Sequence, residues 1–119
     1  MMYKIAVASS NGEIIDQHFG QANQFYIYEV NDADYKFVEL RKLENVPENF
    51  NSDHDKFLYI IKALSGCRIV VVSQIGQGAI KFLGKNGIHA FDVEGPIDYA
   101  LKKLVEYYYK VDKIDRYCN

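Results

Sequence analysis

Four consecutive apolar residues, Ile69-Val70-Val71-Val72, narrow the folds open to this chain more than any other feature. A strand with one face in water alternates apolar and polar side chains, whereas an unbroken apolar run needs apolar cover on both faces. Such runs are typical of parallel strands in α/β proteins, where helices lie on both sides of the sheet. The run therefore predicts a buried parallel strand within residues 68–73.

The residues before this run predict strands. Three segments are rich in β-branched and aromatic residues, and polar turn residues separate them. A short further strand, Glu13-Ile14-Ile15, is expected after the turn at Ser10-Asn11-Gly12. The three main segments form a predicted β-meander and run from Tyr3 to Ser9, from Phe25 to Val30 and from Tyr35 to Leu43.

The second half of the chain changes to helical periodicity. Apolar residues recur at helical spacing over 57–64, after Gly76 and after Pro96, where proline suits the first turn of a helix. A further strand is expected over residues 88–93. A meander followed by alternating helices and strands predicts an α/β fold with one mixed sheet flanked by helices.

Length and composition favour one globular domain, which we expect over residues 1–109, followed by a polar tail over 110–119. The net charge of -2 and the pI of about 5.9 argue against nucleic acid as a partner. The chain has no apolar stretch long enough to cross a membrane and no signal-peptide pattern, so a cytoplasmic location is expected. The two cysteines, Cys67 and Cys118, are then expected as thiols and are too few to hold an ordinary iron–sulfur cluster alone.

A histidine loop, Asp16-Gln17-His18-Phe19-Gly20, lies between the first two main strands. Gly20 is expected to permit an unusual backbone conformation, and Phe19 to anchor the loop by burying its ring. The His18 imidazole would then be held at the surface as a hydrogen-bonding group or a metal ligand. The alternative is an ordinary loop histidine with no task.

Several segments together resemble the dinitrogenase iron–molybdenum cofactor biosynthesis family, which includes NifX-like proteins and the C-terminal domain of NifB. The resemblance covers about Tyr3 to Tyr108, and its most specific part is the His-Phe-Gly loop followed by a Phe-x-Ile-Tyr-Glu strand. It implies a ribonuclease H-like fold, with a five-stranded mixed sheet and helices on both faces. It also implies a carrier for an iron–sulfur or iron–molybdenum cofactor precursor, with no catalytic activity. The matching segments are Ile5-Ala6-Val7-Ala8, residues 15–22, residues 25–30 and residues 67–78, continued by Gly87-Ile88.

Carried over by position, the resemblance implies that His18 is a candidate cluster ligand and that Cys67 matches a family cysteine. Many relatives have an acidic residue where this chain has Gly66, and a further cysteine within the stretch that matches residues 50–55 here. His54 is a candidate substitute for that cysteine, because imidazole also binds iron. Capping of the following helix is the simpler interpretation of the acids beside it.

A glycine turn, Gly76-Gln77-Gly78, follows the apolar strand and opens a helix. It lacks the remaining residues of a dinucleotide or P-loop motif, so no nucleotide is expected. Gly76 and Gly78 are candidates for contact with an anionic metallocluster at the helix N-terminus, although a tight turn alone explains the glycines.

Three functional interpretations follow. The favoured one is a cofactor carrier that works with metallocluster-assembly proteins, as a monomer or a weak homodimer. The alternative is a protein-interaction or small-ligand module that has kept the fold without the cluster. A two-metal nuclease is disfavoured because the first strand, Tyr3 to Ser9, carries no acidic residue.

Overall fold

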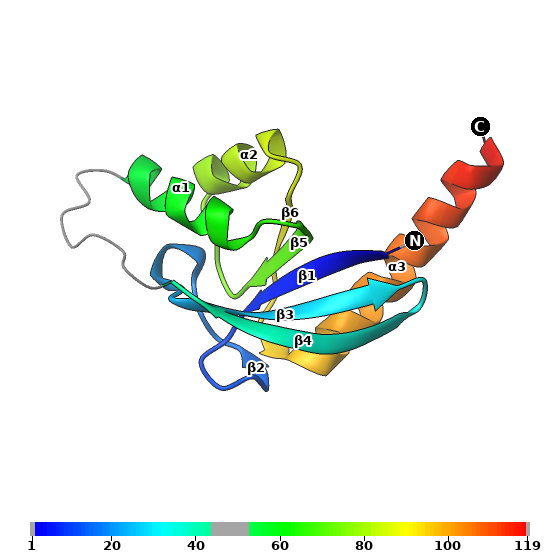
Figure 1. Cartoon of the computed structure of the whole chain (residues 1–119), viewed down its shortest axis with the longest axis horizontal. Coiled ribbons are helices and arrows are strands. Elements are labelled where there is room, and N and C mark those ends of the chain that lie inside the picture. Colours follow the sequence, from blue (N-terminus) through cyan, green and yellow to red (C-terminus); the bar gives the residue numbers. More distant parts are fainter. Residues whose placement is uncertain (1, 44–52, 119) are drawn as a thin grey trace.

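A five-stranded mixed sheet forms the centre of the computed structural model (Figure 1). The structure describes residues 2–43 and 53–118, with the side chains of residues 2–43 and 58–113. The strand order is β4-β3-β1-β5-β6. These strands are β1 (Met2–Ala8), β3 (Gln24–Asn31), β4 (Asp34–Lys42), β5 (Cys67–Val72) and β6 (His89–Asp92).

The two halves of the sheet differ in direction. β1, β3 and β4 pair antiparallel, which confirms the predicted meander. β5 pairs parallel with β1 on one side and with β6 on the other. Residues Ile69 to Val72 have no exposed surface, because helices cover both faces of the sheet at β5. The prediction of a buried parallel strand is confirmed.

Helices lie on both faces of the sheet, as expected. Figure 1 shows α1 (Asp53–Ala63) and α2 (Gln77–Lys85) on one face and α3 (Ile97–Cys118) on the other. Each face has its own apolar core, because successive residues of β1, β3 and β5 point to opposite sides. The core under α1 and α2 includes Phe19, Phe25, Ile27, Ile60 and Leu83. The core under α3 includes Ile5, Tyr28, Val30, Ile69 and Leu101.

A second, two-stranded sheet joins the two halves of the chain. β2 (Ile14–Ile15) pairs antiparallel with β7 (Gly95–Pro96). The sequence predicts Pro96 in the first turn of the last helix, whereas it lies in β7 and α3 begins at the next residue. The backbone of Ile97 also donates a hydrogen bond to the Glu13 carbonyl, at 2.9 Å, which fixes where the helix starts.

The last helix extends beyond its predicted end. The polar segment that begins at Lys110 is expected as a tail, but α3 continues to Cys118. The Arg68 guanidinium donates two hydrogen bonds to the Asp112 carboxylate, at 2.9 and 3.1 Å, and so attaches this part of the helix to β5. Within the described residues, no helix is long and apolar enough to cross a membrane.

Candidate functional site

The His18 loop is attached to the end of the buried strand β5. The Phe19 amide donates to the Gln74 carbonyl and the Ser73 amide donates to the Gln17 carbonyl, both at 2.9 Å. His18 and Gln74 thus form an isolated parallel bridge just beyond the C-terminal end of β5. In open α/β sheets, ligands commonly bind outside the C-terminal ends of parallel strands.

The loop buries one aromatic ring and exposes one imidazole. Phe19 begins the short 3-10 helix η1 (Phe19–Gln21) and is only 2% exposed, packed in the core under α1 and α2. His18 precedes it with an extended backbone and is exposed. Among the described residues, the imidazole has no hydrogen-bond or ion-pair partner. The predicted arrangement, a buried phenylalanine beside a surface histidine, is confirmed, and both ring nitrogens are available.

Gly20 differs from its prediction. It is absent from the residues of positive φ, so this loop does not use the backbone freedom that glycine provides. A Cβ built there would meet no atom within 4 Å, and the same holds for Gly76 and Gly78. The backbone around His18 therefore borders open space at all three glycines.

The glycine turn lies at the same end of the sheet as His18. Gly76 caps α2 with an extended backbone, and the helix begins at Gln77, three residues after the Gln74 bridge. The first turn of a helix has amide groups without intrahelical acceptors and carries a partial positive charge. Gly76 and Gly78 place no side chain of their own over this backbone.

Asp16 does not orient the imidazole. Its carboxylate accepts hydrogen bonds from the Ser10 amide, at 2.9 Å, and from the Ser10 hydroxyl. The hydrogen bond from the Ser10 hydroxyl lowers the pKa of Asp16. Asp16 therefore ties the histidine loop to the turn after β1.

Two buried polar atoms beside the bridge were not anticipated from the sequence. Gln17 Oε1 and Ser73 Oγ are buried and have no hydrogen-bond partner within the described residues. No sequence motif marks them, because their burial depends on the pairing of the loop with the end of β5.

Cys67 lies at the opposite end of β5. At about 3.3 Å per residue, the stretch from Cys67 to Gln74 is about 23 Å long. The structure therefore does not bring Cys67 and His18 together. Cys67 is 7% exposed and belongs to the core under α1 and α2.

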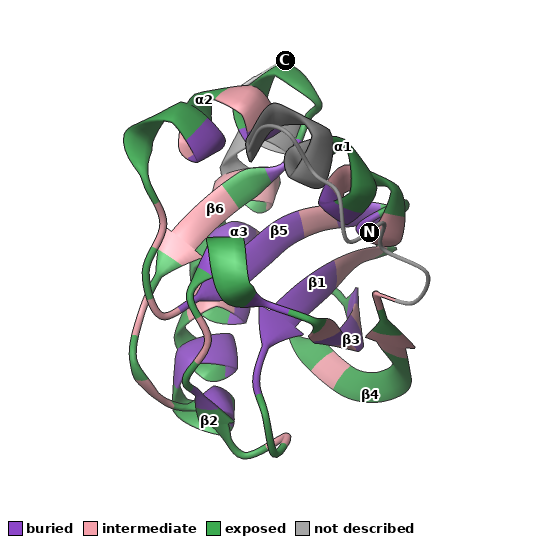
Figure 2. Cartoon of the chain, turned by 90° about the vertical axis from the view of Figure 1, so that its left-hand side faces the viewer, coloured by how far each residue is buried: buried purple, intermediate pink, exposed green. Residues whose placement is uncertain are grey.

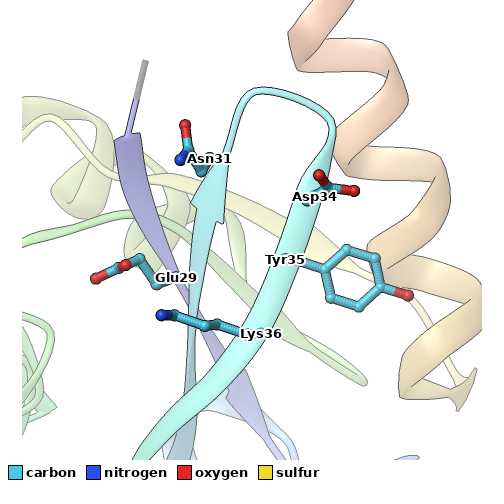
Figure 3. Close-up of a pocket in the computed structure, with 5 residues that line it drawn as sticks. All are labelled: Glu29, Asn31, Asp34, Tyr35 and Lys36. Atoms are coloured by element: carbon cyan, nitrogen blue, oxygen red, sulfur yellow. The ribbon is translucent and has the colours of Figure 1, made fainter.

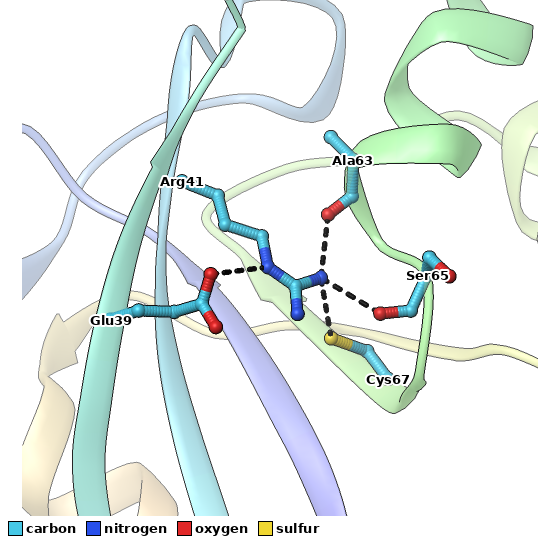
Figure 4. Close-up of polar contacts among 5 residues, drawn as sticks. All are labelled: Glu39, Arg41, Ala63, Ser65 and Cys67. Carbon is cyan, nitrogen blue, oxygen red and sulfur yellow. Dashed lines mark hydrogen bonds and ion pairs between the residues drawn. The ribbon is translucent and has the colours of Figure 1, made fainter.

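Arg41 lies beside the thiol of Cys67 and binds three neighbouring groups, an arrangement that no sequence motif indicates (Figure 4). One guanidinium nitrogen lies 4.0 Å from Cys67 Sγ and donates to the carbonyls of Ala63 and Ser65, at 2.9 and 2.8 Å. A second nitrogen donates to Glu39 at 2.9 Å. Burial raises the pKa of Cys67, and the positive charge of Arg41 only partly opposes this. Arg41 thus satisfies carbonyls at the end of α1.

We expect Cys67 to react slowly with iodoacetamide. Because its pKa is raised, the reactive thiolate is scarcer at pH 8 than in an ordinary cysteine, and burial restricts access further. In a C118S variant, alkylation followed by mass spectrometry should be at least about tenfold slower in the folded protein than in urea. Equal rates in both conditions would contradict this description of the thiol.

The other candidate positions that the structure describes form no metal centre. Among the described residues, no group of three or more His, Cys, Asp or Glu side chains could hold a metal ion. His54 lies in α1, but its side chain is outside the described residues.

A pocket of about 240 Å³ lies at the β3–β4 hairpin, away from the His18 loop (Figure 3). It is at the end of the sheet where Asn31 pairs with Met2, at the start of β1, whereas the histidine loop follows the end of β1. Its lining residues are Glu29, Asn31, Asp34, Tyr35 and Lys36.

Comparisons with known proteins agree on one family. The family model described as dinitrogenase iron-molybdenum cofactor matches residues 1–107. The FeMo cofactor biosynthesis protein NifB of Frankia alni is 32% identical over 103 residues, which are 84% of this chain and 20% of that protein. Protein NifX of Azotobacter vinelandii is 32% identical over 92 residues, 77% of this chain and 57% of NifX. The chain therefore spans about a fifth of the NifB relative and somewhat more than half of NifX.

The fold also has a solved counterpart. The crystal structure of PH0822 superposes with a TM-score of 0.67 over 87% of this chain and 88% of that one. The two chains are 24% identical, so this likeness bears on the fold alone.

Proposed function

Because the chain belongs to the dinitrogenase iron–molybdenum cofactor family, we propose that it is a non-catalytic carrier for an iron–sulfur or iron–molybdenum cofactor precursor. The cargo binds where the His18 loop and the start of α2 meet the C-terminal end of β5. Metallocluster-assembly proteins deliver the cargo and receive it. The names of the relatives, NifB and NifX, support a role in FeMo-cofactor biosynthesis.

The observation that carries the proposal is the unengaged imidazole of His18. A ligand must offer a free lone pair, and His18 is exposed with no partner among the described side chains. Its backbone is fixed by the bridge to Gln74 and by the buried ring of Phe19. A neutral imidazole in this position can coordinate iron with little rearrangement.

The start of α2 supports the same location. An anionic cluster is favoured by the free amide groups and partial positive charge of a helix N-terminus. Gly76 and Gly78 let the cargo approach that backbone closely. One imidazole and a set of weak backbone contacts suit a carrier that must release what it binds.

Cys67 and His54 remain predicted ligands of lower rank. Cys67 is buried, has a raised pKa and lies at the far end of β5, so it would serve a site separate from His18. The five-stranded mixed sheet agrees with the expected α/β class, and the ribonuclease H-like label stays a prediction. The described part of β1 carries no acidic side chain, which supports a carrier over a two-metal nuclease.

We expect His18→Ala to abolish or strongly weaken cargo binding. Even residues that only orient a metal ligand commonly contribute 10- to 100-fold to affinity, so removing the ligand should cost roughly that or more. The measurement is an anaerobic titration with a purified iron–sulfur cofactor precursor, followed by visible absorbance and bound iron per chain.

His89→Ala is the matched control, because it also removes one imidazole, from β6, where His89 Nδ1 lies 2.9 Å from the Tyr108 hydroxyl. It should bind like the unaltered protein. A loss confined to His89→Ala, or unchanged binding by His18→Ala, would move the site away from His18. No binding by the unaltered protein would contradict the carrier function and favour an interaction module.

A further inference from the structure

Strand β4 forms one edge of the sheet and is largely exposed. No described element covers its outer edge, and Figure 2 shows most of β4 as exposed, whereas β1 and β5 in the middle of the sheet are largely buried. Three apolar side chains on it remain in contact with water: Phe37 is 51% exposed, and Val38 and Leu40 are each 38% exposed. An edge strand of nine residues with free backbone groups can pair with another strand.

The pairing of β4 with β3 shows on which face of the sheet each side chain of β4 lies. Residues opposite one another in a ladder point to the same face. Lys36 and Glu39 lie opposite Glu29 and Ile27, on the face of α1 and α2, as do Asp34 and Arg41 farther along. Four other residues of β4 lie on the face of α3. They are Tyr35, Phe37, Leu40 and Lys42, which lie opposite Val30, Tyr28, Tyr26 and Gln24, respectively.

A bulge changes this alternation in the middle of the strand. Tyr28 pairs with Phe37 and Ile27 pairs with Glu39, so Val38 is an extra residue without a partner on β3. The extra residue shifts the alternation by one, so that an even-numbered residue before Val38, such as Lys36, shares a face with an odd-numbered residue after it, such as Glu39. When two β4 strands pair antiparallel, two opposed residues from opposite sides of Val38 therefore lie on the same face only if their residue numbers add up to an odd value.

Charge separates the two central registers that satisfy this condition. If the opposed numbers sum to 77, Lys36 meets Arg41 of the second copy and like charges face each other at two symmetric positions. If they sum to 75, Lys36 meets Glu39 on that same face. Asp34 then lies opposite Arg41, whose guanidinium also binds Glu39 and the carbonyls of Ala63 and Ser65 in its own chain. Tyr35 and Leu40 are then opposed on the other face. Opposite charges on directly opposed residues stabilise a strand pair, and like charges destabilise it.

We propose that β4 is a self-association surface that takes the β4 strand of a second copy of this chain. The two strands pair antiparallel about a twofold axis, with Lys36 opposite Glu39. The two sheets then form one continuous sheet of ten strands. Within the described residues, the Lys36 ammonium and the Asp34 carboxylate have no ion-pair partner. Glu39 is already ion-paired with Arg41 of its own chain at 2.9 Å, so Lys36 of a second copy adds to an existing pair.

The proposed interface leaves the His18 loop open. β3, β1 and β5 separate β4 from the strand whose end carries the histidine bridge. The dimer therefore does not depend on the carrier function, and either can fail without the other.

The test is sedimentation velocity over a range of concentrations, for the unaltered chain and charge variants. The unaltered chain should dimerise reversibly. K36E and E39K should each raise the dimer dissociation constant about tenfold or more, because two attractive pairs become repulsive in each dimer. The double variant K36E/E39K restores opposite charges and should recover most of the affinity.

K42E is the matched control. It reverses one charge on the same strand, but Lys42 lies beyond the residues opposed in this register, so dimerisation should be unchanged. A protein that stays monomeric at all concentrations would overturn the proposal. So would dimers that K36E and E39K leave unaffected.

The register itself can be checked by disulfide formation. In a C118S background, an equal mixture of K36C and E39C chains should form a mixed disulfide dimer on mild oxidation, because opposed residues have adjacent Cβ atoms. Each variant alone should cross-link far more slowly. Equal cross-linking in all samples would overturn the register.

Discussion

Replacing Phe19 by alanine is expected to lower the free energy of unfolding by about 3 to 5 kcal/mol, the usual cost of deleting a buried phenylalanine ring. The ring is 2% exposed and belongs to the core under α1 and α2. It also holds the loop from which His18 projects. Urea unfolding followed by circular dichroism measures the loss.

Gly20→Ala is the control for this change. It alters the next residue of the same loop, where a Cβ would meet no atom within 4 Å and φ is not positive. The free energy of unfolding should therefore change by no more than about 0.5 kcal/mol. If Phe19→Ala cost less than about 1 kcal/mol, the ring would not be the anchor of the loop.

Replacing Arg68 by alanine should cost about 2 to 4 kcal/mol and loosen the end of α3. The guanidinium lies 4.6 Å from the centre of the Tyr108 ring and 5.1 Å from that of Tyr3, and it binds Asp112. The substitution removes these contacts, including both hydrogen bonds to the largely buried Asp112 carboxylate. Hydrogen exchange should become faster in α3 beyond Tyr108.

The double variant R68A/D112A provides the control. Because Arg68 and Asp112 bind each other directly, its loss of stability should be smaller than the sum of the two single losses. R68K keeps the charge but not the two parallel hydrogen bonds, so it should lie between R68A and the unaltered protein. Additive losses would mean that the pair does not act as a unit.

Tyr3 completes this cluster without ionising. Burial is the main cause that raises its pKa to about 12, and the Arg68 cation only partly offsets it. Burial also raises the pKa of Tyr108, whose hydroxyl lies 2.9 Å from His89 Nδ1. The rings around Arg68 therefore stay neutral through the physiological pH range.

Local sequence signals predicted most of the fold. The run Ile69–Val72 predicted the buried strand, and β-branched and aromatic residues between polar turns predicted β1, β3 and β4. The β2–β7 pair and the extension of α3 escaped prediction. Both depend on contacts between distant residues, such as Ile14 with Pro96, that no local pattern specifies.

The candidate site was predictable only in part. The loop composition indicated a surface histidine beside a buried ring. The bridge from His18 to Gln74 could not be inferred, because it joins residues far apart in the sequence through two backbone hydrogen bonds. Gly20 suggested a special backbone conformation that the loop does not use.

The bridge between His18 and Gln74 also bears on when a binding surface can arise during folding. The loop comes from the antiparallel half of the chain, and its partner comes from the parallel half. Contacts between such distant segments form late, because the long stretch of chain between them must lose conformational entropy before they can form. A chain that has folded only its N-terminal meander therefore has the histidine but not the surface that fixes it. The surface proposed to hold cargo is thereby complete only in molecules that have finished folding.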